Sequence, residues 1–199
     1  MKLQSTVGIL GLQGDFAKHY SHITRLCGLT LAVRYPKQLD KIDGLIIPGG
    51  ERTTIGKLMS RQGLLEPLAR RIQVGLPVFG TCAGAILLAK EILESQQHRL
   101  GVMDISVSRN EYGPQTESFE VDIDFPAIGR ESIRSVFIRA PVIRRVGEQV
   151  RVMGEFEGRP VLVRQHNMLA ATFHPELTAD LRIHSYFLDM IAEAAPEEG

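Results

Sequence analysis

A cysteine lies at a tight junction between two apolar segments. Residues 80–84 read Gly-Thr-Cys-Ala-Gly and directly follow the apolar segment 76–79. They match the pattern G-x-nucleophile-x-G, in which a strand turns sharply into a helix and presents the central side chain above a sheet. Small neighbours prevent clashes at such a turn, which explains the flanking glycines. We therefore interpret Cys82 as a candidate nucleophile, and the alternative is a small buried hydrophobic residue.

The residues after Cys82 support this interpretation. Apolar residues recur at i, i+3, i+4 and i+7 from Ala85 to Ile92, which predicts a helix that begins at the cysteine. A sulfur at a helix amino terminus lies at the positive end of the helix dipole, which favours the thiolate form. The backbone amide of Ala83 can also receive an oxyanion. Cys27, by contrast, lies on the apolar stripe of another predicted helix and is expected in the core.

His174 is the best candidate for the base that a nucleophilic cysteine needs. It lies in the segment Thr-Phe-His-Pro-Glu-Leu, residues 172–177. Residues i and i+2 of an extended segment point the same way, so Glu176 can hydrogen-bond one nitrogen of His174 while the other faces the thiol. The remaining histidines are expected to be structural or solvent-exposed, and no pair of them has metal-ligand spacing: His19, His22, His98, His166 and His184.

The elements that must position these residues alternate in the first half of the chain. The expected strands are residues 6–12, 29–35, 44–50 and 76–80, and the expected helices are residues 15–28 and 53–75, with a break near Gly63. This order predicts a mostly parallel sheet with helices on both faces. In such sheets ligands bind beyond the carboxyl ends of the strands, where the Pro-Gly-Gly segment 48–50 and the Cys82 junction both fall.

The second half of the chain changes character from about His98. Short alternating segments separated by turn residues indicate strands that extend or flank the sheet, several of them antiparallel, and residues 179–194 are typical of a closing helix. There is no internal repeat or linker, so we expect a single domain over residues 1–199. The predicted fold class is a three-layer α/β structure with a mostly parallel central sheet and additional antiparallel strands.

Composition argues against several classes of function. Lys plus Arg equals Asp plus Glu, 23 against 23, so bulk charge gives no reason to expect nucleic acid or a membrane surface as a partner. The apolar stretch 7–12 is too short for a signal peptide or a membrane span. Two cysteines in 199 residues favour a reducing, cytoplasmic compartment. We find no dinucleotide fingerprint and expect no cofactor.

Several segments together resemble one family of proteins. They are LQGDF (12–16), PGGE (48–51), GTCAG (80–84), RNEYGPQTESFE (109–120), FIRAP (137–141) and FHPELTADLRIHSYF (173–187). This set is similar to the glutaminase subunits of pyridoxal 5′-phosphate synthase, which are class I glutamine amidotransferases with a flavodoxin-like fold. GTCAG with a distant His-Pro-Glu is shared by many class I glutaminases, whereas LQGDF, SFE and FIRAP point to the vitamin B6 branch.

The resemblance implies hydrolysis of the side-chain amide of L-glutamine. Cys82, His174 and Glu176 would form a catalytic triad that works through a glutamyl thioester. The ammonia would pass to a synthase subunit, a (β/α)8 barrel, within a large hetero-oligomer. The resemblance implies no cofactor and no metal in this chain, and it places partner contact near residues 13–16 and the helix that follows.

The resemblance also implies where glutamine is bound. The backbone amides of Gly50 and Ala83 would form the oxyanion hole. The amino acid end of the substrate would lie near Gly50, Glu51, Arg52, Arg109, Ile138 and Arg139. An arginine suits an α-carboxylate, and a glutamate suits an α-ammonium group. Without the family context, the alternative for Arg109 and Arg139 is a surface ion pair.

Two positions depart from the family pattern. The family usually reads PGGES and YGRQ, whereas this chain has Arg52 and Pro114 at the corresponding points. A cation beside the oxyanion loop puts the affinity for glutamine in question, and Pro114 removes a charge and an amide donor near Arg109. Two alternatives stay open: a non-catalytic subunit that docks on the synthase and regulates it, and a glutaminase of another pathway such as imidazole-glycerol-phosphate synthase.

Overall fold

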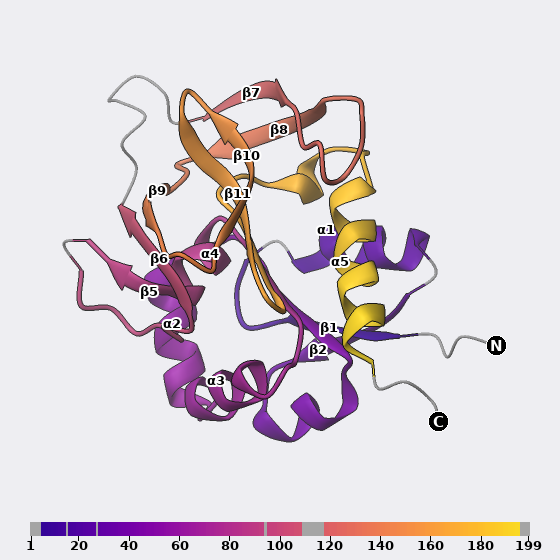
Figure 1. The fold of residues 1–199 in the computed structure, drawn as a ribbon. Helices are drawn as coiled ribbons and strands as arrows, with labels where there is room; N and C mark the ends of the chain where they lie inside the picture. Colours follow the sequence, from indigo (N-terminus) through magenta and orange to yellow (C-terminus); the bar gives the residue numbers. More distant parts are fainter. Residues whose placement is uncertain (1–4, 15, 27, 94, 109–117, 196–199) are drawn as a thin grey trace.

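A seven-stranded sheet forms the centre of the fold (Figure 1). The computed structural model describes residues 5–14, 16–26, 28–93, 95–108 and 118–195. The strands of the central sheet follow one another in the order β10 (Arg151–Phe156), β11 (Arg159–Gln165), β12 (Met168–Ala171), β4 (Val78–Thr81), β3 (Gly44–Ile47), β1 (Thr6–Leu10) and β2 (Leu29–Val33). Strands β12 to β2 run parallel, and β11 and β10 continue the sheet in antiparallel pairing. The mostly parallel sheet that the sequence predicts is confirmed.

Helices cover both faces of this sheet. They are α1 (Phe16–Arg25), α2 (Arg52–Arg61), α3 (Leu65–Gln73), α4 (Ala83–Leu88) and α5 (Arg182–Ala194). Because side chains alternate along a strand, Ile46 of β3 joins one buried cluster with Ile23 of α1 and Phe187 of α5. Its neighbours Leu45 and Ile47 join another cluster with residues of α2, α3 and α4. Figure 1 shows α1 and α5 on one side of the sheet and α2 and α3 on the other, which confirms the three-layer α/β fold. In the described part of the chain, no helix is both long enough and apolar enough to cross a membrane.

Two smaller sheets flank the central one. The first contains β5 (Ala89–Ile92), β6 (Met103–Ser108) and β9 (Val142–Val146), and the second is formed by β7 (Ser118–Ile123) and β8 (Ile133–Ile138). Strands β6 and β9 pair antiparallel, as do β7 and β8. The prediction of additional antiparallel strands in the second half of the chain is therefore confirmed.

The helix predicted from Ala85 to Ile92 is wrong in its second half. Helix α4 ends at Leu88, and the next residues form β5, which pairs with β6. An irregularity in the β5–β6 register between Ala89 and Glu91 lets both Ala89 and Ile92 face the core. The same apolar spacing therefore fits a helix and this strand, and tertiary pairing decides between them.

The fold brings the ends of three strands together. Strands β12 and β4 pair in parallel, with Ala171 opposite Thr81, and β3 pairs with β4 on its other side. The carboxyl ends of parallel strands lie at the same edge of a sheet, so the chain segments that follow these strands meet there. Cys82, His174 and the Pro-Gly-Gly segment 48–50 all lie just beyond this edge.

Candidate active site

Cys82 occupies a strained backbone conformation between β4 and α4. Its φ and ψ are 47° and −102°, a combination that residues other than glycine rarely adopt. The Cys82 N–H donates to the oxygen of Ala171 at 2.8 Å, which ties the turn to β12. A Cβ on Gly80 would come within 2.6 Å of the backbone of Gly84, and a Cβ on Gly84 would collide with the oxygen of Ile47. Both glycines are therefore required by the close packing of the strand against the helix.

His174 and Glu176 follow the neighbouring strand β12. The His174 N–H donates to the oxygen of Val136 at 2.8 Å, which fixes the backbone here. Glu176 lies in the 3-10 turn η2 (Pro175–Leu177), and its Oε1 is 2.8 Å from His174 Nδ1. Its carboxyl group is buried. The structure thus brings together the residues that the sequence predicts as a triad, and their catalytic roles stay a prediction.

The contacts of His174 favour its protonated form. Burial alone lowers the pKa of His174, but hydrogen bonds and charge interactions with Cys82 and Glu176 outweigh burial and raise it to about 10. Because Nδ1 is bonded to Glu176, Nε2 is the nitrogen that faces the sulfur. An imidazolium beside a sulfur stabilises the thiolate, which is the nucleophilic form. A nucleophile, a base and an orienting carboxylate in this order can carry out acyl transfer.

The loop after β3 packs directly against this pair. A Cβ on Gly49 would lie 2.5 Å from Cε1 of His174 and 3.5 Å from Cβ of Cys82, so the loop approaches as closely as it does only because it is glycine. The Gly49 N–H donates to Oγ1 of Thr81 at 3.1 Å, and this bond is buried. Gly50 follows with φ of 154°, in the range that favours glycine. Main-chain groups rather than side chains therefore surround the thiol on this side.

The two residues whose backbone amides are predicted to form the oxyanion hole are the direct sequence neighbours of Gly49 and Cys82. Gly50 directly follows Gly49, and Ala83 directly follows Cys82. Ala83 is the first residue of α4, where backbone N–H groups have no acceptor within the helix. Two N–H groups placed in this way can stabilise a developing oxyanion, and this assignment stays a prediction.

Ile138 lies beside Cys82 at the end of β8. Its carbonyl oxygen is 3.8 Å from the Cys82 sulfur, and its side chain is 40% exposed. Arg139, the next residue, has φ of 45°, which turns the chain sharply at this point. Ile138, one residue of the predicted substrate region, is thus next to the sulfur, and Arg139 directly follows it in the chain. Arg109 and Pro114 lie outside the described residues.

Glu51, predicted to bind the substrate's amino group, caps helix α2. Its carboxylate accepts hydrogen bonds from the N–H groups of Thr53 and Thr54. These bonds, foremost that from Thr54, hold the pKa of Glu51 at about 2. The Glu51 N–H in turn donates to Oε1 of Gln13 at 2.8 Å. Arg52, which replaces the usual serine, is the first residue of α2.

Sequence reasoning missed a contact made by His19. The sequence predicts that His19 is structural or solvent-exposed, and it is fully buried, with Nε2 3.5 Å from Oε2 of Glu176. The sequence did hold a signal, since Phe16, His19 and Ile23 follow the i, i+3 and i+7 spacing of one helix face. His22 and His184 are buried beside it. His98 and His166 are exposed, as expected, and Cys27 lies outside the described residues.

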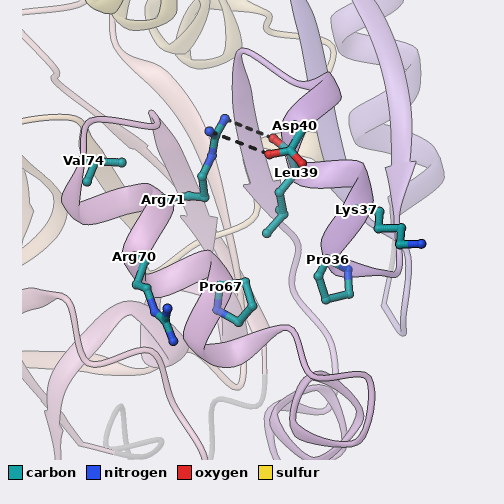
Figure 2. A pocket seen from close by; sticks show the side chains of 8 residues that line it. All are labelled: Pro36, Lys37, Leu39, Asp40, Pro67, Arg70, Arg71 and Val74. Atoms are coloured by element: carbon teal, nitrogen blue, oxygen red, sulfur yellow. Dashed lines mark hydrogen bonds and ion pairs between the residues drawn. The ribbon is translucent and has the colours of Figure 1, made fainter.

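A separate hollow of about 420 Å³ lies between α3 and the 3-10 turn η1 (Pro36–Lys41) (Figure 2). Pro36, Leu39, Pro67 and Val74 give it apolar walls. None of its lining residues belongs to the triad or to the glycine loop. In the described ranges of the chain, no group of three or more His, Cys, Asp and Glu side chains is placed to hold a metal ion.

The chain resembles known proteins over nearly its whole length. The family model described as SNO glutamine amidotransferase matches residues 9–193. A pyridoxal 5′-phosphate synthase subunit PdxT from Carboxydothermus hydrogenoformans is 54% identical over 187 residues, which cover 94% of this chain and 98% of that protein. The PdxT protein from Pelotomaculum thermopropionicum is 55% identical over 188 residues, covering 94% and 96%. A crystal structure of a glutamine amidotransferase superposes with a TM-score of 0.90 at 49% identity, covering 94% and 98%.

Proposed function

Since the chain belongs to the SNO glutamine amidotransferase family, we propose that it is the glutaminase subunit of a pyridoxal 5′-phosphate synthase. The family indicated by the sequence motifs is thereby confirmed. The observation that carries the proposal beyond family membership is the position of His174, which is hydrogen-bonded to Glu176 and whose pKa is raised by its interactions with Cys82 and Glu176. The protein hydrolyses L-glutamine to L-glutamate and ammonia as a single glutaminase domain.

The first half of the reaction breaks the amide bond. The Cys82 thiolate attacks the amide carbon, and the negative charge that develops on the oxygen is received by the amides of Gly50 and Ala83. His174 donates its Nε2 proton to the nitrogen as the carbon–nitrogen bond breaks. Ammonia leaves, and the glutamyl group stays on the sulfur as a thioester.

The second half of the reaction releases glutamate. Neutral His174 takes a proton from a water molecule, which attacks the thioester carbon. The carbon–sulfur bond breaks, the sulfur leaves as a thiolate, and His174 is again an imidazolium beside it. Glu176 stays ionised throughout and stabilises each imidazolium state of the ring. No step requires an oxidant, a reductant or a metal.

The substrate's amino acid end is held by residues on both sides of the sulfur. The proposed contacts are Gly50, Glu51, Arg52, Arg109, Ile138 and Arg139. The position of the Ile138 oxygen, 3.8 Å from the Cys82 sulfur, supports this assignment for the segment at the end of β8. The ammonia passes to a (β/α)8-barrel synthase subunit in a hetero-oligomer, and docking on that subunit raises the glutaminase activity. A cytoplasmic location is proposed because a nucleophilic cysteine must stay reduced.

The test measures glutamate released from L-glutamine by the chain alone and mixed with its synthase subunit. The wild-type chain should release glutamate, faster on mixing, and Cys82→Ala should lower kcat by about 10⁴-fold or more because the nucleophile is lost. Unchanged activity of Cys82→Ala would refute the mechanism. A wild-type chain that binds the synthase but releases no glutamate in either condition would identify a non-catalytic regulatory subunit.

A further inference from the structure

The two carboxylate oxygens of Glu176 face different partners. Oε1 lies 2.8 Å from His174 Nδ1, as the mechanism requires. Oε2 is buried and lies 3.5 Å from His19 Nε2, with no hydrogen-bond partner of ordinary length among the described residues. Hydrogen bonds around a catalytic site are often long before substrate binds and shorten in the reacting complex. His19 is therefore the group available to hold the second oxygen of Glu176.

Burial keeps His19 and its neighbour His184 uncharged. Burial lowers the pKa of His19 well below its ordinary value, and His184 adds to the effect. Burial likewise lowers the pKa of His184 to about 3, with a contribution from His22. Both rings are neutral at neutral pH, so each carries one N–H and one bare nitrogen.

The partners of these rings decide which nitrogen carries the proton. A carboxylate only accepts hydrogen bonds, so the proton of His19 belongs on Nε2, towards Glu176. His19 Nδ1 is then bare and accepts from Nε2 of His184, which is 2.9 Å away. His184 Nδ1 is left without a proton, and it has no hydrogen-bond partner among the described residues. These hydrogen bonds are thus all donated in one direction. His184 on α5 donates to His19 on α1, and the N–H of His19 points to Glu176.

His19 also lies close to a residue that holds the Gly49 loop, which packs against Cys82 and His174. Its Nε2 lies 3.4 Å from Oγ1 of Thr81, the same oxygen that accepts the N–H of Gly49 at 3.1 Å. Gly49 packs directly against the His174 ring. A single N–H of His19 therefore lies within reach of both the carboxylate that orients His174 and the hydroxyl that holds the glycine loop.

We propose that His19 is a positioning residue for glutamine hydrolysis, held in place by His184, and that it acts through Glu176 and Thr81. This inference rests on the proposed glutaminase function. Partners that orient metal-binding side chains typically change activity by about 10- to 100-fold when they are removed, and we expect an effect of the same order for a group that orients His174 through Glu176. Since His19 does not touch substrate, its loss should lower kcat and leave KM for glutamine within about threefold.

The experiment compares two amides at position 19 in the complex with the synthase subunit. The His19→Gln side chain places an N–H near the former Nε2, whereas His19→Asn places one only near the former Nδ1. We expect His19→Asn to lower kcat by about 10- to 100-fold and His19→Gln to stay within about fivefold of wild type. The matched control is His22→Asn, which changes a histidine buried on the same helix whose Nε2 bonds instead to the oxygen of Thr178. It should stay within about threefold of wild type.

A double-mutant cycle separates positioning from packing. In a Glu176→Gln background, His19→Asn should lower kcat by a smaller factor than it does in the wild-type chain, because Glu176, one of the two groups through which His19 acts, is already altered. An equal loss in both backgrounds, or a loss no larger than that of His22→Asn, would overturn the inference. If His19→Asn fails to fold, His184→Leu makes the same comparison, with a loss of kcat at constant KM expected. A wild-type complex that releases no glutamate would overturn the proposed function itself.

Discussion

The two sides of the His174 ring have opposite surroundings. On the sulfur side lie Gly49 and the carbonyl of Ile138, so these neighbours of Cys82 are main-chain groups. On the carboxylate side lie Glu176 and His19, whose side chains are completely buried. We call the sulfur side, where Cys82 is buried but still 8% exposed, the open side, and the carboxylate side, where the side chains are completely buried, the closed side.

This difference follows from what each side must do. The sulfur side has to admit a substrate closely, and glycine leaves room for it while main-chain amides supply fixed donors. The carboxylate side has to hold one charge in one orientation, and exclusion of water strengthens the electrostatic interaction that does so. A change on the open side should therefore affect activity first, whereas a change on the closed side should affect stability as well.

Among changes to the surroundings of the His174 ring, the largest effect on activity is expected from Gly49→Ala, which fills the open side. The new Cβ would lie 2.5 Å from His174 Cε1 and 3.0 Å from Nδ1, so the ring must move. Displacement of a reacting group by about 1 Å costs on the order of 10²-fold, and we expect kcat/KM to fall by at least about that factor. The control is Gly129→Ala, where the new Cβ would meet only the flexible side chain of Arg182, at 3.3 Å, and which should retain activity. Equal activity of Gly49→Ala and wild type would show that the ring tolerates contact on this side.

A smaller effect, visible in stability, is expected on the closed side from the charge of His174. Because the folded protein raises the pKa of His174 from 6.5 to about 10, it stabilises the imidazolium relative to the unfolded chain. That contribution is complete below pH 6.5 and is lost as the pH rises to about 10. We compare the free energies of unfolding of wild type and His174→Gln. The difference between them should shrink by up to about 4 kcal/mol as the pH rises from 6.5 to about 10.

Urea unfolding of both proteins at several pH values between 6 and 9.5 measures this difference. The subtraction removes the titration of groups that do not interact with His174, so the difference reports His174 together with Cys82 and Glu176, whose charges are coupled to it. A difference that stays constant with pH would mean that His174 is neutral when folded. The closed side would then hold a hydrogen bond rather than a charge.

The smallest effect is expected away from both sides, at the hollow in Figure 2. Arg70 lines this hollow and pairs with Glu66 at 3.1 Å, and both side chains are largely exposed. Exposed pairs of this kind contribute about 0 to 1 kcal/mol, so Arg70→Ala should change stability by less than about 0.5 kcal/mol and leave glutamine hydrolysis unchanged. The same unfolding and glutamate assays apply. A clear loss of activity would show that the hollow communicates with the triad.

Local patterns predicted the open side better than the closed side. Glycines around Cys82 and the His-x-Glu spacing are short-range signals, and the alternation of elements places them at neighbouring strand ends. The contact between His19 and Glu176 joins helices and turns far apart in the chain, so no local pattern specifies it. Strand β5 was missed for the same reason, since its pairing with β6 is not encoded in the apolar spacing that it shares with a helix.

The hydrogen bond between His19 and His184 also has a consequence for biosynthesis. These residues are 165 positions apart in the chain. A ribosome that adds about 5 to 20 residues per second needs roughly 8 to 33 seconds to travel from one to the other. After residue 82 has been added, the nascent chain carries Cys82 but cannot yet close the cluster that supports Glu176. The newly made protein therefore acquires its complete site only after α5 has been synthesised and has docked against α1.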